Sequence, residues 1–318
     1  MRTRFALAAT LSLALIGGTA AIAGAIPASS PPDNGKLTPA AQSFAKVDRN
    51  TSWKLARKIR LDFPTHHPQG FALVGDLIFM SSVQIDEKPE KYPEPVDGYD
   101  RSTGKGVGHV LVMTREGKLV KDIVVGEGSM YHPGGIDFDG KSVWVPVAEY
   151  RPNSESIMYR IDAKTLEATE AFRHRDHVGG AVFDRSSGKV RGVSWGSRKF
   201  FTWTPKGDLL TSSANPSHMI DYQDCDYAGA GKQLCSGVTG LPTANGGNYE
   251  LGGLALTDPA TDKIMHEVPF PHFSAAGHAV TRNPVALEAE GSALRLFAAP
   301  DDGEETAGTE LLVFESTP

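Results

Sequence analysis

Cysteine and basic clusters are scarce in this sequence. Cys225 and Cys235 are its only two cysteines among 318 residues. Their spacing is not C-x-x-C, so we expect a local structural disulfide, not a redox or metal dithiol. The net charge is −6, with acidic and basic residues interspersed. Because nucleic acids and anionic membranes attract clustered Lys and Arg, the sequence predicts neither as a partner.

Long apolar runs are also missing after the first residues. Arg2 and Arg4 precede an apolar run from Phe5 to Ile16 that is too short to span a bilayer. Alanines at positions 21, 23 and 25 supply A-x-A cleavage sites. We therefore expect a signal peptide over residues 1–25, a flexible leader over 26–50 and one domain over 51–318, with a retained anchor as the alternative. The mature protein is predicted to be secreted or extracytoplasmic, free of the membrane and monomeric.

The common catalytic and cofactor motifs are not found. The sequence contains no HExxH, no EF-hand loop, no Cys/His knuckle and no phosphate or dinucleotide loop, because its glycine pairs start strands and not helices. Gly192-Val-Ser-Trp-Gly resembles a serine-hydrolase elbow only superficially, since a strand-to-helix turn is not expected there. No nucleotide cofactor is predicted.

A repeated unit is present instead. Its opening motif occurs at His67-Pro-Gln-Gly, His132-Pro-Gly-Gly and His177-Val-Gly-Gly, and an alternating strand pair follows, as at residues 71–80 and 136–145. The second half of the unit is a hairpin with a polar turn, found at residues 110–120, 158–167, 201–210 and 254–264. Repeated four-stranded units of this kind predict an all-β fold, a β-propeller.

The two chain ends predict how the ring closes. A fourth blade begins near Asp221 and carries the disulfide and a Gly/Asn-rich insertion over Thr239–Asn248, and the last unit, from about His278, lacks one strand. Residues 53–61 alternate apolar and polar and supply the missing strand, which gives five blades. A six-bladed propeller is the alternative, with a weak blade inside residues 83–107. We favour five, because Glu87–Asp97 is Pro-rich without alternation and predicts a loop on the rim.

These motifs resemble a known but uncharacterised family. The two His-Pro motifs, His177-Val-Gly-Gly and Trp144-Val-Pro-Val-Ala-Glu-Tyr are similar to those of bacterial secreted propeller proteins, over most of the chain after about residue 50. The resemblance implies a propeller and no particular activity. The blades are more distantly similar to gluconolactonase, paraoxonase and strictosidine-synthase-like propellers, but the lactonases' acidic and amide calcium ligands have no alignable counterparts here.

The repeat places three histidines at equivalent positions around the channel. The loop into each innermost strand opens at one channel mouth, so His67, His132 and His177 should converge there. Three imidazoles suit a divalent ion such as zinc, iron or manganese, with calcium as a further possibility, and Asp221 and His278 stand near the corresponding places in the last two blades. A metal-free acid–base cluster and a purely structural turn role are the alternatives.

Two classes of function follow from this site. The first is a hydrolase or lyase acting on a small molecule, with His67, His132, His177, Asp137 and Arg282 as catalytic candidates. The second is a non-catalytic protein that binds a small ligand or another protein at the channel mouth or rim. Further candidates are Gln69, Glu149, Tyr150 and Trp195.

Overall fold

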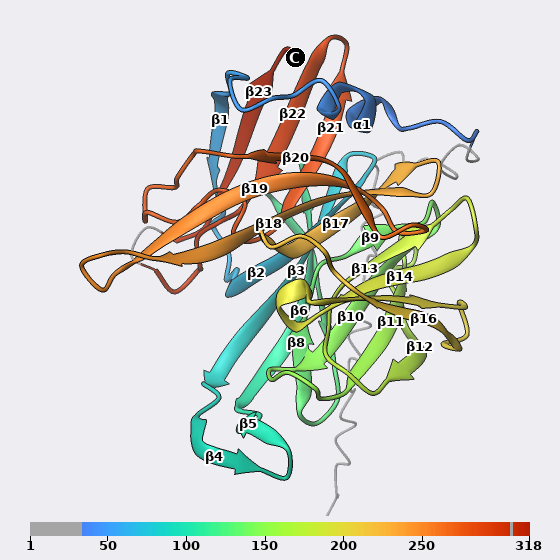
Figure 1. Cartoon of the computed structure of the whole chain (residues 1–318), viewed down its shortest axis with the longest axis vertical. Helices are drawn as coiled ribbons and strands as arrows, with labels where there is room; N and C mark the ends of the chain where they lie inside the picture. Colours follow the sequence, from blue (N-terminus) through green and yellow to red (C-terminus); the bar gives the residue numbers. More distant parts are fainter. Residues whose placement is uncertain (1–33, 306–307) are drawn as a thin grey trace, which may run out of the picture.

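The computed structural model describes residues 34–305 and 308–318, and these form a five-bladed β-propeller with almost no helix (Figure 1). Blade 1 contains β2 (His67–Val74), β3 (Leu77–Glu87), β6 (Lys105–Thr114) and β7 (Leu119–Val125). Blade 2 contains the split inner strand β8 (Met130–Pro133) and β9 (Asp137–Phe138), then β10 (Ser142–Glu149), β11 (Ser156–Asp162) and β12 (Ala168–His174). The five-bladed fold predicted from the repeats is confirmed.

The other three blades follow the same order. Blade 3 contains β13 (Val178–Asp184), β14 (Lys189–Ser194), β15 (Lys199–Trp203) and β16 (Leu209–Ala214). Blade 4 contains β17 (Asp221–Gly229), β18 (Lys232–Pro242), β19 (Asn248–Asp258) and β20 (Lys263–Pro269). Blade 5 contains β21 (Val285–Glu290), β22 (Ala293–Ala298), β23 (Glu310–Ser316) and β1 (Lys54–Arg60).

The N-terminal strand closes the ring, as predicted. β1 pairs antiparallel with β23, with Ile59 opposite Leu311, so the first and last strands of the described chain share one sheet (Figure 1). Closure leaves no blade short of a strand. The buried apolar residues form five clusters, one between each pair of neighbouring blades. The alternation of apolar residues seen in the sequence therefore reflects burial between blades.

Glycines explain why the opening motifs converge on the axis. Gly70 and Gly135 each stand three residues after a motif histidine. A Cβ atom on Gly70 would lie 2.6 Å from Gly135 Cα, and one on Gly134 would lie 2.2 Å from the Gly179 carbonyl oxygen. Gly135 N also donates to Gly179 O at 2.9 Å. Only residues without side chains allow the innermost strands to approach this closely, and the histidines are drawn together with them.

Acidic side chains complete the packing of the inner strands. Asp224 of β17 accepts backbone hydrogen bonds from Phe71 at 2.7 Å and from Ile136 at 3.1 Å. These donors belong to blades 1 and 2, so one buried carboxyl group from blade 4 ties three blades together. Such groups satisfy backbone N–H donors that have no strand partner at the axis.

Two segments differ from the sequence expectation. The segment predicted as a rim loop forms a small hairpin of β4 (Lys91–Val96) and β5 (Tyr99–Arg101), which adds no sixth blade. β4 is mostly exposed, so it buries no face that alternation would reveal. In addition, β18 and β19 continue as one long hairpin through the region predicted as an insertion, and turn at residues 243–247.

The leader is also more ordered than expected over its described part. Residues 1–33, including the predicted signal peptide, lie outside the described residues. Within residues 34–50, however, α1 (Pro39–Phe44) is capped by Thr38 and packs on blades 4 and 5 beside β21 (Figure 1). Ala41, Phe44 and Val47 are 0 %, 0 % and 1 % exposed. The composition of this segment predicted a flexible chain, but the burial of these apolar side chains stabilises an ordered one.

The expected disulfide is present. Cys225 of β17 and Cys235 of β18 are bonded and lie in the apolar cluster between blades 3 and 4. A structural disulfide is typical of proteins in an oxidising, extracytoplasmic compartment. Among the described residues, no helix is both long and apolar enough to cross a bilayer.

Candidate functional site

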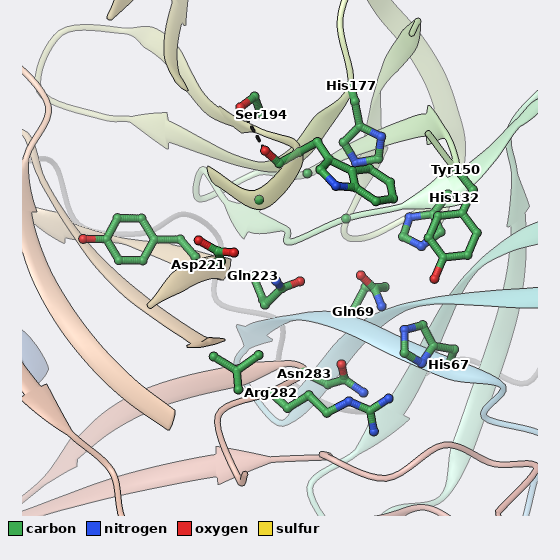
Figure 2. A pocket seen from close by; sticks show the side chains of 16 residues that line it. His67, Gln69, His132, Tyr150, His177, Ser194, Asp221, Gln223, Arg282 and Asn283 are labelled. Carbon is green, nitrogen blue, oxygen red and sulfur yellow. Dashed lines mark hydrogen bonds between the residues drawn. The ribbon is translucent and has the colours of Figure 1, made fainter. Parts of the chain in front are cut away.

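One mouth of the channel holds a cavity of about 350 Å³. Its walls come from the segments around the starts of the innermost strands and from the ends of second strands, and every blade contributes (Figure 2). Five residues singled out from the sequence as catalytic or metal-binding candidates line it together: His67, His132, His177, Asp221 and Arg282. Gln69, Tyr150 and Trp195 line the same cavity.

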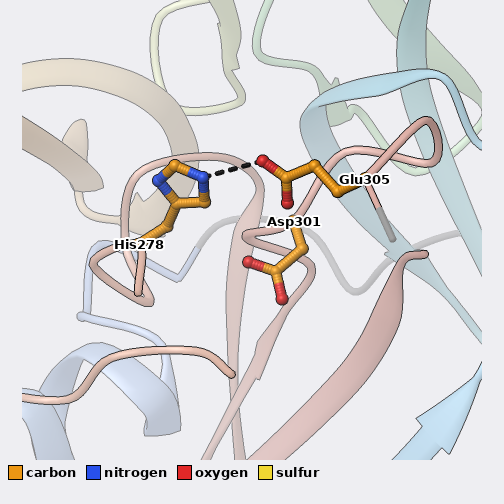
Figure 3. Close-up of side chains that lie close together, drawn as sticks. All are labelled: His278, Asp301 and Glu305. Atoms are coloured by element: carbon orange, nitrogen blue, oxygen red, sulfur yellow. Dashed lines mark hydrogen bonds and ion pairs between the residues drawn. The ribbon is translucent and has the colours of Figure 1, made fainter. Parts of the chain in front are cut away.

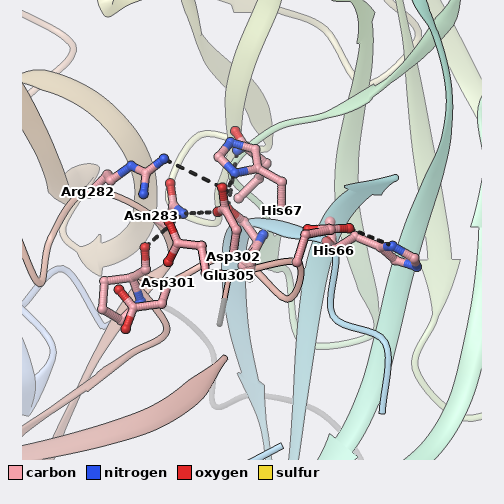
Figure 4. A network of polar contacts seen from close by, with 12 residues as sticks. His66, His67, Arg282, Asn283, Asp301, Asp302 and Glu305 are labelled. Atoms are coloured by element: carbon pink, nitrogen blue, oxygen red, sulfur yellow. Dashed lines mark hydrogen bonds and ion pairs between the residues drawn. The ribbon is translucent and has the colours of Figure 1, made fainter. Parts of the chain in front are cut away.

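His67 is held by a carboxylate. Its Nδ1 lies 2.6 Å from Asp302 Oδ1, and Arg282 lies 3.7 Å from the other oxygen of the same group (Figure 4). Burial alone would raise the pKa of Asp302. The hydrogen bond and charge of His67, together with Arg282, outweigh burial and bring the pKa below its usual value. Asp302 is therefore a carboxylate and accepts a hydrogen bond from Nδ1–H of His67, so Nε2 is the ring nitrogen left for a further partner.

His177 is oriented by the backbone. Its Nδ1 lies 2.9 Å from the Glu149 carbonyl oxygen, and its ring meets Trp195 edge-on at 4.8 Å between centroids. A carbonyl oxygen can only accept, so Nδ1 carries the proton and the lone pair is on Nε2. Burial lowers the pKa of His177 to about 4, although the Glu149 carbonyl opposes this shift. The ring is neutral at ordinary pH.

His132 is buried without a polar partner. It is 6 % exposed, and neither ring nitrogen has a hydrogen-bond partner among the described residues. Its ring packs on Tyr150 at 4.1 Å and lies 6.0 Å from His177 between centroids. Burial, then the neighbouring His177 and His67, holds its pKa well below the usual value. An imidazole placed this way has two unused nitrogens, which is costly unless a ligand or ion uses one.

Asp221 occupies the opposite wall of the cavity. It accepts from Arg198 at 2.9 Å and lies apart from the three histidines in the close-up (Figure 2). Burial raises the pKa of Asp221, and the charge of Arg198 opposes this. Asp221 therefore lines the wall of the cavity, and it does not lie where it could bind one ion together with the three histidines.

Two candidate residues lie elsewhere. Asp137 was expected to share the histidine mouth, but it lines a separate cavity of about 320 Å³ with Arg185 and Asp226. Its two oxygens accept from the backbone of Phe183 at 3.0 Å and of Tyr227 at 3.3 Å. The alternation of β9 does turn Asp137 towards the axis, but there it joins blades 3 and 4 and has no contact with the histidines.

His278 is also separated from the mouth. It precedes β21 by several residues, and its loop carries it to Asp301 and Glu305 (Figure 3). Within residues 34–305 and 308–318, His278, Asp301 and Glu305 form a group whose possible metal-ligand atoms all lie within 4.8 Å of one another. Arg282 and Asn283 reach the mouth from blade 5 in its place. The looser alignment of the last repeat misplaced His278.

The remaining candidates have supporting positions. The Glu149 side chain pairs with Arg151 at 2.6 Å and accepts from Ser129 at 2.5 Å, and its carbonyl oxygen, not its carboxylate, contacts His177. Ser194 lines the cavity, but its Oγ accepts from Lys199 N at 2.9 Å and donates to Trp195 O at 3.3 Å, and it forms no hydrogen bond to a histidine among the described residues. This arrangement gives no support to a serine nucleophile.

The β4–β5 hairpin reaches the cavity rim. The Arg101 guanidinium lies 5.1 Å from the ring centre of Trp195, and Arg151 lies 3.4 Å from that of Tyr99. Tyr131 anchors the segment by donating to Thr103 O at 2.6 Å. The hairpin therefore places a cation and aromatic surface beside the histidines.

Sequence reasoning missed three residues of this site. Asp302, Asn283 and Gln223 were not singled out, although the first contacts His67 and the other two line the cavity. Asp302 is 235 positions from His67, which no local pattern reveals. An acidic pair followed by glycine at 301–303, after the second strand of the last blade, was the available signal.

Comparison with known proteins gives a family but no activity. The profile of a family of unknown function (DUF6454) matches residues 21–316. No curated protein of known annotation matches the sequence. The fold is similar to Kuenenia stuttgartiensis hydrazine synthase, at 11% identity and TM-score 0.39, over 76% of this chain and 58% of that one.

Two other solved structures are similar at the same level. The Neurospora crassa Pan2 WD40 domain has 12% identity and TM-score 0.42, over 86% of this chain and 97% of its own. A luciferin-regenerating enzyme has 9% identity and TM-score 0.43, over 82% of this chain and 95% of its own. Likenesses this distant say nothing about chemistry.

Proposed function

The chain belongs to this family of unknown function, and we propose that it is a secreted enzyme, a metal-assisted hydrolase or lyase acting on a small polar molecule at the channel mouth. The observation that carries the proposal is the state of the three imidazoles. His67 and His177 each have Nδ1 engaged by an oxygen, and His132 is buried with both nitrogens unpartnered. Metal-binding histidines commonly donate their second nitrogen to a carboxylate or a backbone carbonyl.

The arrangement fits an ion chemically. Neutral imidazole is a strong ligand for zinc and similar ions, and all three rings come from equivalent positions of successive blades. His132 and His177 have ring centroids 6.0 Å apart. Two imidazoles on one zinc ion have centroids roughly 5 Å apart, given metal–nitrogen distances of about 2 Å. Small rotations would therefore bring both rings to a shared ion.

The protein's own groups supply binding and orientation. Asp302 fixes the His67 ring, and its contact with His67, together with the charge of Arg282, keeps Asp302 ionised. The amides of Gln69, Gln223 and Asn283 line the cavity and can hydrogen-bond a polar substrate. An ion bound here would polarise a carbonyl or ester group and lower the pKa of a nearby water molecule.

Compartment and assembly belong to the same proposal. The disulfide and the N-terminal basic and apolar residues support export from the cytoplasm. We take the mature protein to be a monomer because β1 completes blade 5, so no blade lacks a strand that a second copy would have to supply.

A non-catalytic ligand-binding protein is the second candidate. It is favoured by the aromatic side of the cavity, where Tyr150 and Trp195 have ring centroids 5.8 Å apart and Arg101 lies over the latter. Aromatic walls with amide groups hold a planar polar ligand without any reaction. In that case His132 would hydrogen-bond the ligand directly.

Elemental analysis of the purified mature protein tests the proposal. We expect about one equivalent of zinc, iron or manganese to be lost in a His67→Ala/His132→Ala/His177→Ala variant, with no loss in Asp221→Asn. Near-UV circular dichroism of the triple variant confirms that the propeller is intact.

Each result decides between the candidates. Loss of the ion with an intact fold supports a metal centre and directs substrate screens towards esters, lactones and related carbonyl compounds. Unchanged metal content in the folded triple variant, or none in the wild type after incubation with metal salts, rejects the metal centre. The acid–base or binding reading then replaces it.

A further inference from the structure

A second group of metal-type ligands lies outside the channel mouth. His278 comes from the segment between β20 and β21, and Asp301 and Glu305 come from the loop between β22 and β23 (Figure 3). One ligand atom from each residue lies within 4.8 Å of the other two. One imidazole and two carboxylates form a donor set that suits divalent zinc or manganese.

An unsatisfied buried oxygen points independently to a ligand. Asp301 is 1 % exposed, and its Oδ1 has no hydrogen-bond partner among the described residues. Glu305 Oε2 is likewise buried and unpartnered. Burying carboxylate oxygens without partners costs free energy, so a folded chain normally pairs them with a donor or a cation.

The local charge balance also lacks a cation. His278 lies between two carboxylates, with Nδ1 at 3.3 Å from Glu250 and Nε2 at 2.8 Å from Glu305. Asp301 is a third acidic group beside them. Within the described residues, no Lys or Arg forms a salt bridge with any of these three carboxylates. A divalent ion would neutralise the group where a single imidazolium cannot.

We propose that His278, Asp301 and Glu305 bind a divalent metal ion, such as zinc or manganese, at a site separate from the channel mouth. Glu250 lies beside His278 and adds negative charge to the same site.

Such an ion would fix the loop between β22 and β23, which also carries Asp302, the partner of His67 at the channel mouth. Asp302, the partner of His67, directly follows Asp301, and Asn283 Nδ2 donates to Pro300 O at 3.2 Å in the same loop (Figure 4). Asp301 O also accepts from the Thr309 hydroxyl at 2.9 Å. Fixing the Asp301 side chain would therefore limit movement of Asp302, which orients His67.

Zinc stoichiometry in matched variants tests this site. The full mature protein is stripped with EDTA, titrated with Zn²⁺ and followed by calorimetry and elemental analysis. We expect two equivalents in the wild type, and one each in His278→Gln and Asp301→Asn. Glu304→Gln removes the same charge from the same loop and is the control, because Glu304 pairs with His66 and not with the site. It should keep two.

Hydrogen exchange gives a second measurement. Zn²⁺ should slow exchange of the amides of residues 299–305 on the order of tenfold in the wild type, and this protection should be lost in His278→Gln. A variant that fails to fold is recognised by loss of near-UV circular dichroism, and Asp301→Asn, which preserves side-chain shape, then carries the test.

The outcomes separate the two sites. A single equivalent that survives in His278→Gln and is lost in the channel triple variant overturns this inference and leaves the proposed function standing. A single equivalent with the opposite pattern supports this site and rejects the channel metal. No zinc binding at all overturns both, and the hydrogen bonds of His278 to Glu250 and Glu305 are then purely structural.

Discussion

Asp302 fixes the orientation of His67 at the channel mouth. Its carboxylate fixes His67 through the 2.6 Å contact with Nδ1. Removing such a partner from a metal-binding histidine typically costs about 10–100-fold in metal affinity or activity. The role of Asp302 is therefore positioning.

Asp302→Asn should weaken zinc binding at the channel mouth about 10–100-fold. The substitution keeps the shape of the side chain but removes the charge that orients Nδ1–H. The measurement is a competition titration against a chromophoric chelator in a His278→Gln background, where only the channel site remains. Glu304→Gln in the same background should leave the affinity unchanged. Equal affinities in Asp302→Asn and this control would show that His67 needs no carboxylate partner.

Short elements outside the blades also affect the fold. α1 has six residues and too few turns to be stable alone. It persists because Phe44 enters the cluster between blades 4 and 5 and meets the His266 ring edge-on at 5.3 Å. His266 in turn contacts Val47 O at 2.6 Å, just after the helix. The N-terminal segment therefore seals one blade interface.

Phe44→Ala should lower the free energy of unfolding by about 3–5 kcal/mol, because it leaves a cavity in an interface that buries the ring completely. Urea denaturation followed by tryptophan fluorescence measures the change. Lys46→Ala, which alters an exposed position after the helix, should have an effect within about 0.5 kcal/mol. A loss below about 1 kcal/mol in Phe44→Ala would mean that α1 detaches without disturbing the blades.

At the scale of the whole molecule, the repeated motif is the feature of the sequence from which the fold could be predicted. In the repeated motif a histidine is followed three residues later by a glycine. This motif predicted the blades and their order, and it predicted that His67, His132 and His177 line one cavity. The same repeat gave the strand that closes blade 5.

Features without a repeat were lost to sequence reasoning. The exposed β4–β5 hairpin buries no alternating face, and the six residues of α1 cannot show helical periodicity. His278 and Asp302 are placed by loops whose course depends on tertiary contacts and not on blade register. Asp137 has the predicted direction but reaches a different part of the axis.

The axis also carries three acidic residues from two blades, Asp137, Asp224 and Asp226, of which the first two are 3 % and 1 % exposed. Burial raises the pKa of Asp137 to about 7, although Arg185 opposes this, and raises those of Asp224 and Asp226 well above the usual value. A carboxyl group with a raised pKa stays protonated in the folded state at pH values where the unfolded chain has lost that proton. Folding then binds protons between the two pKa values.

These axial acids should consequently contribute less stability as pH rises from about 4 towards 7, whereas the buried His132 and His177, whose pKa values are lowered, contribute in the opposite sense. Each such acid contributes a slope of up to about −1.4 kcal/mol per pH unit, because the unfolded state holds fewer protons. Urea midpoints at intervals across this range measure the slope, and Asp137→Asn should make the slope more positive than that of the wild type, because it removes one negative contribution. Asp62→Asn removes an exposed carboxylate and should leave it unchanged. If Asp137→Asn and wild type have parallel curves, Asp137 is ionised throughout, and its charge must be balanced by Arg185 at the axis.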